Sequence, residues 1–208
     1  MAQSLVGFLL LFPLFIVAVS VHEVSHGIVA LYFGDSTALR AGRLTLNPFR
    51  HIDLFGTVLL PGILLILRAP IVFGWAKPVP VNSSFLRHPK RDMLWVGAAG
   101  PVSNFLMAAA GALVVRSLGS ALSGLPALMA QYFVLVNLFL GVFNLLPIPP
   151  LDGSRVLTSL LPAALARGMI FLERWGFLIL ILLLSAGIVD RVMMPIVDRL
   201  AVLFLGAQ

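Results

Sequence analysis

Long apolar runs are the feature that most constrains how this chain can fold. Hydrophobic residues make up 60% of the 208 residues and charged residues only 11%, and the mean hydropathy is +1.07. A water-soluble domain of this size rarely reaches such values. Several runs approach the ~20 residues that a helix needs to cross the hydrocarbon layer. The sequence therefore predicts an all-α, polytopic membrane protein, with residues 1–208 forming a single membrane-embedded domain.

The apolar runs predict about five to six transmembrane helices. Four longer runs cover about residues 5–33, 93–115, 125–146 and 175–189. Pro61-Gly62 breaks a shorter run at 54–67, which favours a re-entrant segment over a full span. The last run, 192–205, contains Asp198 and Arg199, so it is either a short span or an interfacial helix.

The loops between these runs set the expected orientation. Residues 40–48 alternate polar and apolar side chains and contain Gly and Pro, which predicts a short β-hairpin-like loop after the first helix. The net charge is +6, but the basic residues lie in short loops, where cytoplasmic retention explains them, so we expect no nucleic-acid partner. If residues 54–67 re-enter, only Arg116 and Arg191 face the opposite side. The first helix then ends toward the cytoplasm, in a multi-pass protein of the cell membrane.

His22-Glu23-Val24-Ser25-His26 forms an HExxH motif within the first apolar run. Spacing of i and i+4 stacks both imidazoles on one helix face, where they can bind one zinc ion, and Glu23 is suited to take a proton from a metal-bound water. The alternative is a polar helix contact or an ion path. Ionisable residues are costly within a span and mark function by default, so we predict a metal site with His22 and His26 as ligands.

A catalytic zinc usually has three protein ligands and one open position. The chain contains no cysteine, so the third ligand must be a histidine or an acid. The best candidate is Asp152, in the segment from Asn144 to Gly153, whose prolines end helical geometry. Irregular backbone at membrane depth is tolerated where it is buried or lines a wet cavity. The alternative for Asp152 is a helix N-cap or a turn before Gly153.

A third polar group is Gly100-Pro101-Val102-Ser103-Asn104, inside the 93–115 run. Small residues here allow close helix packing. The Asn104 amide could donate a hydrogen bond to a developing oxyanion or hold an extended substrate. An interhelical hydrogen bond is an equally good interpretation, and the case for Asn144 is similar but weaker.

Together these segments resemble the site-2 protease family of intramembrane zinc metalloproteases, peptidase family M50. HExxH, GPxxN and the LDG-containing proline segment occur in the family's order, and with residues 42–48 and 73–82 they cover about residues 1–160. HExxH alone is common to many metalloproteases, but the combination is specific. The resemblance implies one zinc per chain held by His22, His26 and Asp152, with Glu23 as general base and Asn104 near the scissile bond.

The resemblance also implies an endopeptidase that cleaves transmembrane segments of membrane-anchored proteins. Its active site would lie in the lipid bilayer, toward the cytoplasm, and the loop after the first helix would offer a β-like edge, residues 43–47, to an unwound substrate. Zinc would lower the pKa of a bound water and Glu23 would accept its proton. Unlike larger relatives, this compact form shows no PDZ or CBS domain to control access.

Two other classes of protein stay open. A metal or proton transporter would be expected to show paired repeats and acidic residues at several depths, whereas the chain has eight acids, mostly in loops. An inactive membrane scaffold would be expected to lose the glutamate of HExxH, and Glu23 is present. The sequence carries no signal for a particular substrate or oligomeric state, and His51 and His88, in loops, receive no role.

Overall fold

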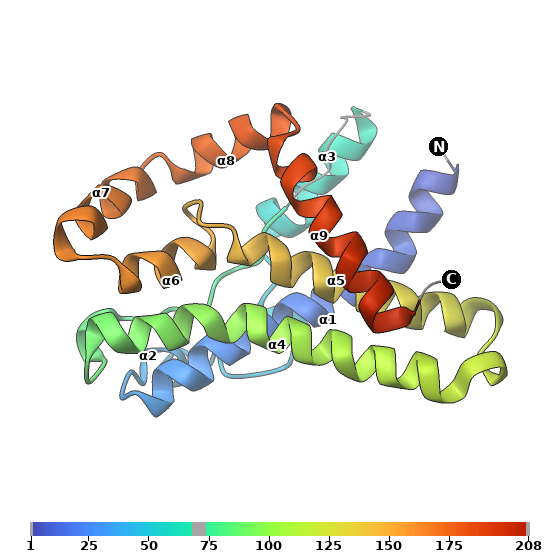
Figure 1. The fold of residues 1–208 in the computed structure, drawn as a ribbon, viewed down its shortest axis with the longest axis horizontal. Coiled ribbons are helices and arrows are strands. Elements are labelled where there is room, and N and C mark those ends of the chain that lie inside the picture. Colours follow the sequence, from blue (N-terminus) through green and yellow to red (C-terminus); the bar gives the residue numbers. More distant parts are fainter. Residues whose placement is uncertain (1, 68–73, 207–208) are drawn as a thin grey trace.

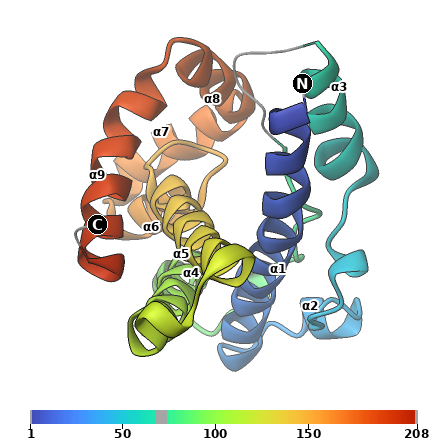
Figure 2. The same cartoon turned by 90° about the vertical axis from the view of Figure 1, so that its right-hand side faces the viewer.

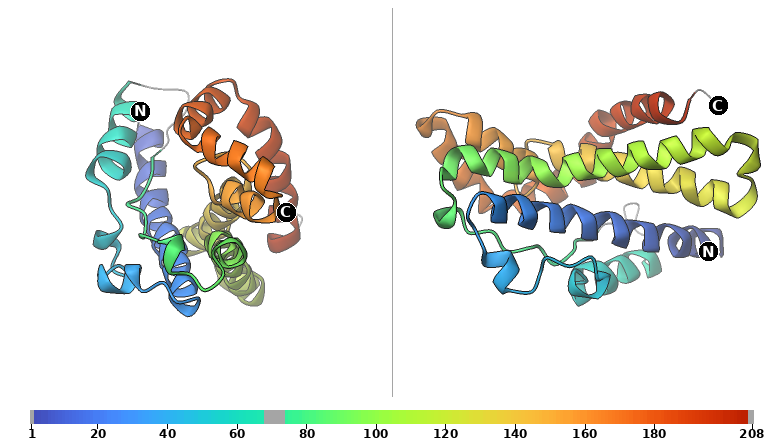
Figure 3. Two further views of the ribbon diagram at one scale, coloured as in Figure 1. Left: turned by 90° about the vertical axis from the view of Figure 1, so that its left-hand side faces the viewer. Right: turned by 90° about the horizontal axis from the view of Figure 1, so that it is seen from below.

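The computed structural model describes residues 2–67 and 74–206, and within these ranges the protein is all-helical. Three long helices, α1 (Ala2–Tyr32), α4 (Pro89–Leu118) and α5 (Gly124–Leu145), lie lengthwise beside one another (Figures 1 and 3). By length and composition, Leu10–Tyr32 of α1, all of α4 and all of α5 are apolar enough to cross a membrane. The prediction of an all-α membrane protein is therefore confirmed.

Shorter helices surround these three. In chain order the α-helices are α2 (Thr37–Arg40), α3 (Leu60–Ile66), α6 (Asp152–Leu160), α7 (Ala163–Glu173), α8 (Gly176–Ser185) and α9 (Ile188–Leu205). The short helical turns are η1 (Pro48–Arg50), the π-helical η2 (Leu54–Leu59), η3 (Ser83–Phe85) and η4 (Gly119–Ala121). Figure 2 shows α3 beside α1 on one side of the bundle and α8 and α9 on the other.

Small residues on one face of α4 let the neighbouring helices approach closely. A side chain added at Gly111 would meet the Phe133 ring of α5 at 2.9 Å, and one at Gly141 of α5 would meet Phe105 of α4 at 2.9 Å. Lipid tails are as apolar as leucine, so helices in a membrane associate through this close packing rather than through burial from water. The opposite faces suit lipid, because large side chains such as Leu106 and Leu113 are each 66% exposed.

The predicted count of five to six spans is not confirmed. Among the described residues, three helices are long and apolar enough to span a membrane, and a fourth span is obtained if α7 and α8, bent by 73° at their junction, count as one broken span. Helix α9 carries Asp190, Arg191, Asp198 and Arg199, and its buried residues Val189, Met193 and Val197 pack with Leu138 of α5. The predicted re-entrant segment corresponds to η2 and α3, which together form a short apolar helix.

The loop after α1 differs from the predicted hairpin. Residues 41–47 are irregular, and no strand occurs in the two described ranges. The loop is held instead by the buried imidazole of His51, whose Nε2–H donates to the Thr45 carbonyl at 2.8 Å, and by Arg43, which donates to the Arg50 carbonyl. Phe73 of the 73–82 segment lies outside the described residues.

Candidate metal centre

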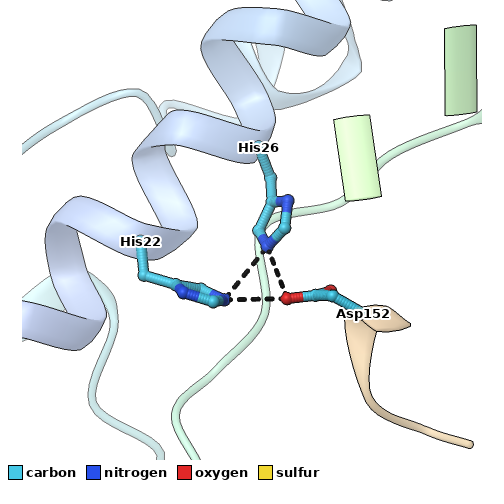
Figure 4. Close-up of side chains that lie close together, drawn as sticks. All are labelled: His22, His26 and Asp152. Carbon is cyan, nitrogen blue, oxygen red and sulfur yellow. Dashed lines mark hydrogen bonds and ion pairs between the residues drawn. The ribbon is translucent and has the colours of Figure 1, made fainter. Parts of the chain in front are cut away.

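Three acceptor atoms lie close together, although they come from two helices that are far apart in the sequence. The Nε2 atoms of His22 and His26 on α1 lie 3.0 Å and 3.1 Å from Asp152 Oδ2, and 3.1 Å from each other (Figure 4). The three residues are only 5–6% exposed. The structure thus brings together the two histidines of HExxH and the aspartate 126 positions later, as the sequence predicted.

The non-helical turn between α5 and α6 determines the position of Asp152. Helix α5 ends at Leu145, and a tight turn follows in which the Ile148 N–H donates to the Leu146 carbonyl at 2.8 Å. Gly153 packs directly on the Leu145 backbone, where no side chain would fit. Asp152 is the first residue of α6 and its side chain caps no helix. The alternative role as an N-cap is therefore not seen.

Both histidines are held in the tautomer that a metal needs. The Nδ1 of His26 lies 2.6 Å from the Val96 carbonyl of α4, and because a carbonyl only accepts, this Nδ1 must carry the proton. The Nδ1 of His22 lies 2.6 Å from Asn104 Oδ1. In the neutral imidazole each Nε2 is then unprotonated and can offer its lone pair, which is the usual arrangement of metal-binding histidines.

The orientation of Asn104 is fixed by a second asparagine. Asn104 Nδ2 donates to Asn137 Oδ1 at 3.0 Å, and Asn137 Nδ2 donates to the Phe133 carbonyl at 2.8 Å. Since this chain of hydrogen bonds ends on a backbone acceptor, each amide can face only one way. The oxygen of Asn104 therefore points at His22, and His22 Nδ1 is the donor.

The donor set and its spacing fit zinc. Two imidazole nitrogens and one carboxylate oxygen converge without a proton between them, so their lone pairs repel unless a cation lies there. A tetrahedral zinc with bonds of about 2.0–2.1 Å keeps neighbouring ligand atoms roughly 3.3 Å apart, and the observed 3.0–3.1 Å is within a few tenths of this.

Gly100 of α4 keeps the space at the three acceptor atoms open. A Cβ at this position would lie 2.5 Å from His22 Nε2 and even closer to His26 Nε2. Even alanine would therefore overlap both rings. The first residue of GPxxN is required by the metal centre as well as by helix packing.

Glu23 faces the same cavity as the ligands. Its Oε2 accepts a hydrogen bond from the Val79 N–H at 2.7 Å. The cavity has a volume of about 170 Å³, and its lining includes Glu23, His26, Asp152, Arg155 and the extended segment that contains Val79. Glu23 is thus positioned to exchange protons with a molecule that occupies this space.

A second cavity of about 520 Å³ continues from the first. It lies between α4, α6 and α7, and the two cavities share Ser83, Met93 and Arg155. Lys90 and Arg167 also line it. Arg155 stands at the junction, with Nη1 3.7 Å from Asp152 Oδ1, so the metal centre opens toward a basic space.

Asn104 makes the interhelical hydrogen bonds of the alternative interpretation. The side chain is fully buried, both ends of its amide bond protein groups, and it lies behind His22 rather than on the cavity. Sequence reasoning also missed Asn137, which an unexplained amide inside an apolar span could have revealed. The Val96 carbonyl and the Val79 N–H are main-chain groups, and such groups are too common in a sequence to mark a site.

Comparison with known proteins agrees with this geometry. The chain is 39% identical over 190 residues to "Putative zinc metalloprotease YwhC" of Bacillus subtilis (strain 168), which covers 88% of this chain and 83% of that protein. A family model described as Peptidase family M50 matches residues 115–183. The chain belongs to peptidase family M50.

Two further relatives are less similar in sequence. "Putative zinc metalloprotease Rip2" of Mycolicibacterium smegmatis is 28% identical over 189 residues, 90% of this chain and 71% of that protein. "Zinc metalloprotease MJ0392" of Methanocaldococcus jannaschii is 28% identical over 151 residues, 73% of this chain and 34% of that protein. No solved structure matches the chain. Membership of M50 confirms the predicted enzyme class, a zinc metalloendopeptidase, and the predicted Zn²⁺ cofactor.

Proposed function

We propose that this M50 protein cleaves membrane-anchored proteins within their transmembrane segments, at a zinc ion held by His22, His26 and Asp152. The observation that carries the proposal is the convergence of three buried acceptor atoms at 3.0–3.1 Å, on and beside a helix apolar enough to cross a membrane. One zinc per chain is expected, because the described residues contain one such group.

Proton transfer is assigned to Glu23. Bound zinc supplies Lewis acidity and lowers the pKa of water. Glu23 is the acid of the motif that lines the cavity without being one of the three converging ligands. It accepts the proton of the attacking water and returns it to the amine that leaves when the peptide bond breaks.

Asn104 is proposed to position His22. Its oxygen accepts from His22 Nδ1 at 2.6 Å, and its complete burial leaves no room for a substrate carbonyl beside its amide nitrogen, which donates to Asn137. An outer partner of this kind fixes the ring orientation and raises the basicity of the ligand nitrogen. This role accounts for the asparagine of GPxxN without contact with the scissile bond.

The substrate must unwind to be cleaved, because helical backbone hides its carbonyls in hydrogen bonds to residue i+4. Unwound backbone needs new partners at membrane depth. The backbone of the loop at 43–47 is proposed to pair with the unwound substrate, as in strand addition. Leu44 of this loop and Val79 of the cavity wall both reach Gly27 of α1, which supports a place for the edge beside the cavity.

The charge distribution supports an active site toward the cytoplasm in the cell membrane. Lys90, Arg155 and Arg167 line the cavity that continues from the metal centre, whereas Arg116 lies in the last turn of α4, at its other end. Lys and Arg are concentrated on the cytoplasmic side of membrane proteins. The basic end of the bundle is therefore assigned to that side.

The test is cleavage of a single-span membrane substrate in detergent by the wild type and by Glu23→Gln, with bound zinc counted in both. We expect Glu23→Gln to lose cleavage by about 10²-fold or more, because general acid–base catalysis is removed, and to retain zinc. Asp198→Asn, which changes an exposed acid on α9, is the matched control and should cleave normally. Equal cleavage by wild type and Glu23→Gln would refute the proposal.

A further inference from the structure

We propose that the backbone N–H of Val79 positions Glu23 for proton transfer, and that the extended segment Lys77–Asn82 is built to deliver this one donor. The inference rests on the proposed function, in which Glu23 is the general base. It assigns a positioning role to a main-chain group in a loop 56 residues away along the chain.

The contact is short and specific. The Val79 N–H donates to Glu23 Oε2 at 2.7 Å, within the range of charge-assisted hydrogen bonds. No protein group in the described ranges bonds to the other oxygen, Oε1. One oxygen is thus fixed while the other is left for the cavity that the glutamate lines.

Two prolines isolate this donor. Pro78 and Pro80 flank Val79, and proline has no N–H. Each proline also restricts the residue before it to an extended conformation, which applies here to Lys77 and Val79. Between Lys77 and Asn82 only Val79 and Val81 can donate from the backbone, and the N–H of Val79 is the one directed at Glu23.

The segment is anchored on both sides of Val79. Before it, the Lys77 N–H donates to the His51 carbonyl at 2.8 Å. After it, the Asn82 N–H donates to Asp35 Oδ2 at 2.6 Å, and Asp35 is itself fully buried. These bonds tie the segment to the two loops that follow α1, so its position relative to α1 is fixed before any substrate arrives.

The Val79 side chain packs the centre of the segment Lys77–Asn82 against α1. It is 7% exposed, and a Cβ at Gly27 would lie 3.0 Å from its Cγ1. Gly27 is four positions after Glu23, so both face the same side of the helix. A larger residue at Gly27 would lift Val79 and lengthen its bond to Glu23.

A fixed carboxylate matters because proton transfer needs hydrogen-bond geometry at the reacting water. The terminal torsion of a glutamate is broad and has no strong preference of its own. A catalytic group has to be held within about 0.5 Å of its productive position by the groups behind it. One hydrogen bond to a charged group is large enough to change the rate by about tenfold or more.

The test compares Val79→Pro with Val81→Pro. Both replaced residues follow a proline, and both variants delete one backbone N–H, but only the first deletes the donor to Glu23. We expect Val79→Pro to lower kcat by about tenfold or more with zinc content close to wild type. Val79 and Val81 both line the cavity, so either variant can change KM, but Val81→Pro should keep kcat within about threefold of wild type.

Two further variants separate the donor from the side chain and from folding. Val79→Ala keeps the N–H and should keep most of kcat. If Val79→Pro does not fold, an ester at position 79, introduced as the α-hydroxy analogue of valine, removes the same donor without the proline ring. It should show the same fall in kcat.

Coupling to Glu23 provides the decisive measurement. In a Glu23→Asp background the shorter acid no longer reaches the Val79 N–H, so Val79→Pro should cause little further loss; a double-mutant cycle measures this directly. Equal kcat values for Val79→Pro and Val81→Pro would overturn the inference. A higher kcat for Val79→Pro than for wild type would also overturn it, because the Val79 N–H would then restrain Glu23 rather than position it. Cleavage by Glu23→Gln would instead refute the proposed function itself.

Discussion

Replacing Gly100 by alanine should place a methyl group directly against the histidine rings of the candidate metal centre. The new Cβ would lie 2.5 Å from His22 Nε2 and closer still to His26 Nε2. Carbon atoms normally stay about 3.5 Å or more from such neighbours, so the rings must move by about 1 Å. Helix α4 cannot retreat, because its Val96 carbonyl and Asn104 hold the same two rings.

The expected loss follows from how precisely a zinc site is built. Ligand distances are normally held within about 0.2 Å, so a shift of about 1 Å disrupts at least one bond to the metal. Disturbing even the outer partners of metal ligands costs about 10- to 100-fold in affinity. We expect Gly100→Ala to weaken zinc binding by about 100-fold, equivalent to about 2.7 kcal/mol.

The assay is zinc bound per chain at buffered free-zinc concentrations, measured beside cleavage of the single-span substrate. Gly97→Ala is the matched control, one turn earlier on α4. Its methyl would meet Val156 Cγ2 at 3.3 Å, Arg155 Cβ at 3.4 Å and the Asp152 carbonyl oxygen at 3.5 Å, contacts that are much less severe than those at Gly100. Wild-type zinc affinity in Gly100→Ala would show that the ligand rings do not occupy the described positions.

Three further outcomes are expected. Asn104→Ala should lower zinc affinity about 10- to 100-fold, whereas Asn104→Asp keeps an acceptor for His22 and should retain zinc; loss of cleavage with full zinc in both would favour direct contact with substrate. A zinc chelator should lower the melting temperature of the wild type, and free zinc at 100 times the dissociation constant should add about 2.7 kcal/mol of stability. Asp35→Asn should destabilise the protein at pH 7 by about 1–3 kcal/mol. Although burial raises the pKa of Asp35, hydrogen bonds from Thr37 and Asn82 lower the pKa overall. The ionised carboxylate therefore stabilises the fold at pH values above its ordinary pKa of 3.8. The difference in unfolding free energy between wild type and Asp35→Asn should fade as the pH falls below that value.

The three residues that meet at the candidate metal centre could be chosen from the sequence because their signals are local. HExxH fixes His22 and His26 through helical periodicity alone, and the prolines around Asp152 mark an irregular segment at membrane depth, where a carboxylate must have a partner or a function. The long helices were predictable for a similar reason, since their apolar runs exceed what a soluble helix needs.

The rest depends on tertiary contacts that the sequence does not display. The sequence left Asn104 between a substrate contact and an interhelical hydrogen bond, because nothing in its neighbourhood reveals that Asn137, 33 residues later, turns its oxygen toward His22. The alternation at 40–48 suggested a hairpin, but His51 binds this loop through the Thr45 carbonyl, and no strand partner is present in the described chain. The predicted count of five to six spans is not confirmed, and apolar content alone does not show the 73° bend between α7 and α8.

The contacts of helix α4 with both histidines should make zinc affinity depend on the thickness of the bilayer. It contacts His26 through Val96 and His22 through Asn104, and these two contacts lie eight positions apart on one helix. A slide of α4 along its axis by one residue, about 1.5 Å, would therefore break both hydrogen bonds together. Bilayers of different thickness tilt or shift the helices that cross them. The same protein should consequently hold zinc with different affinity in thin and thick membranes.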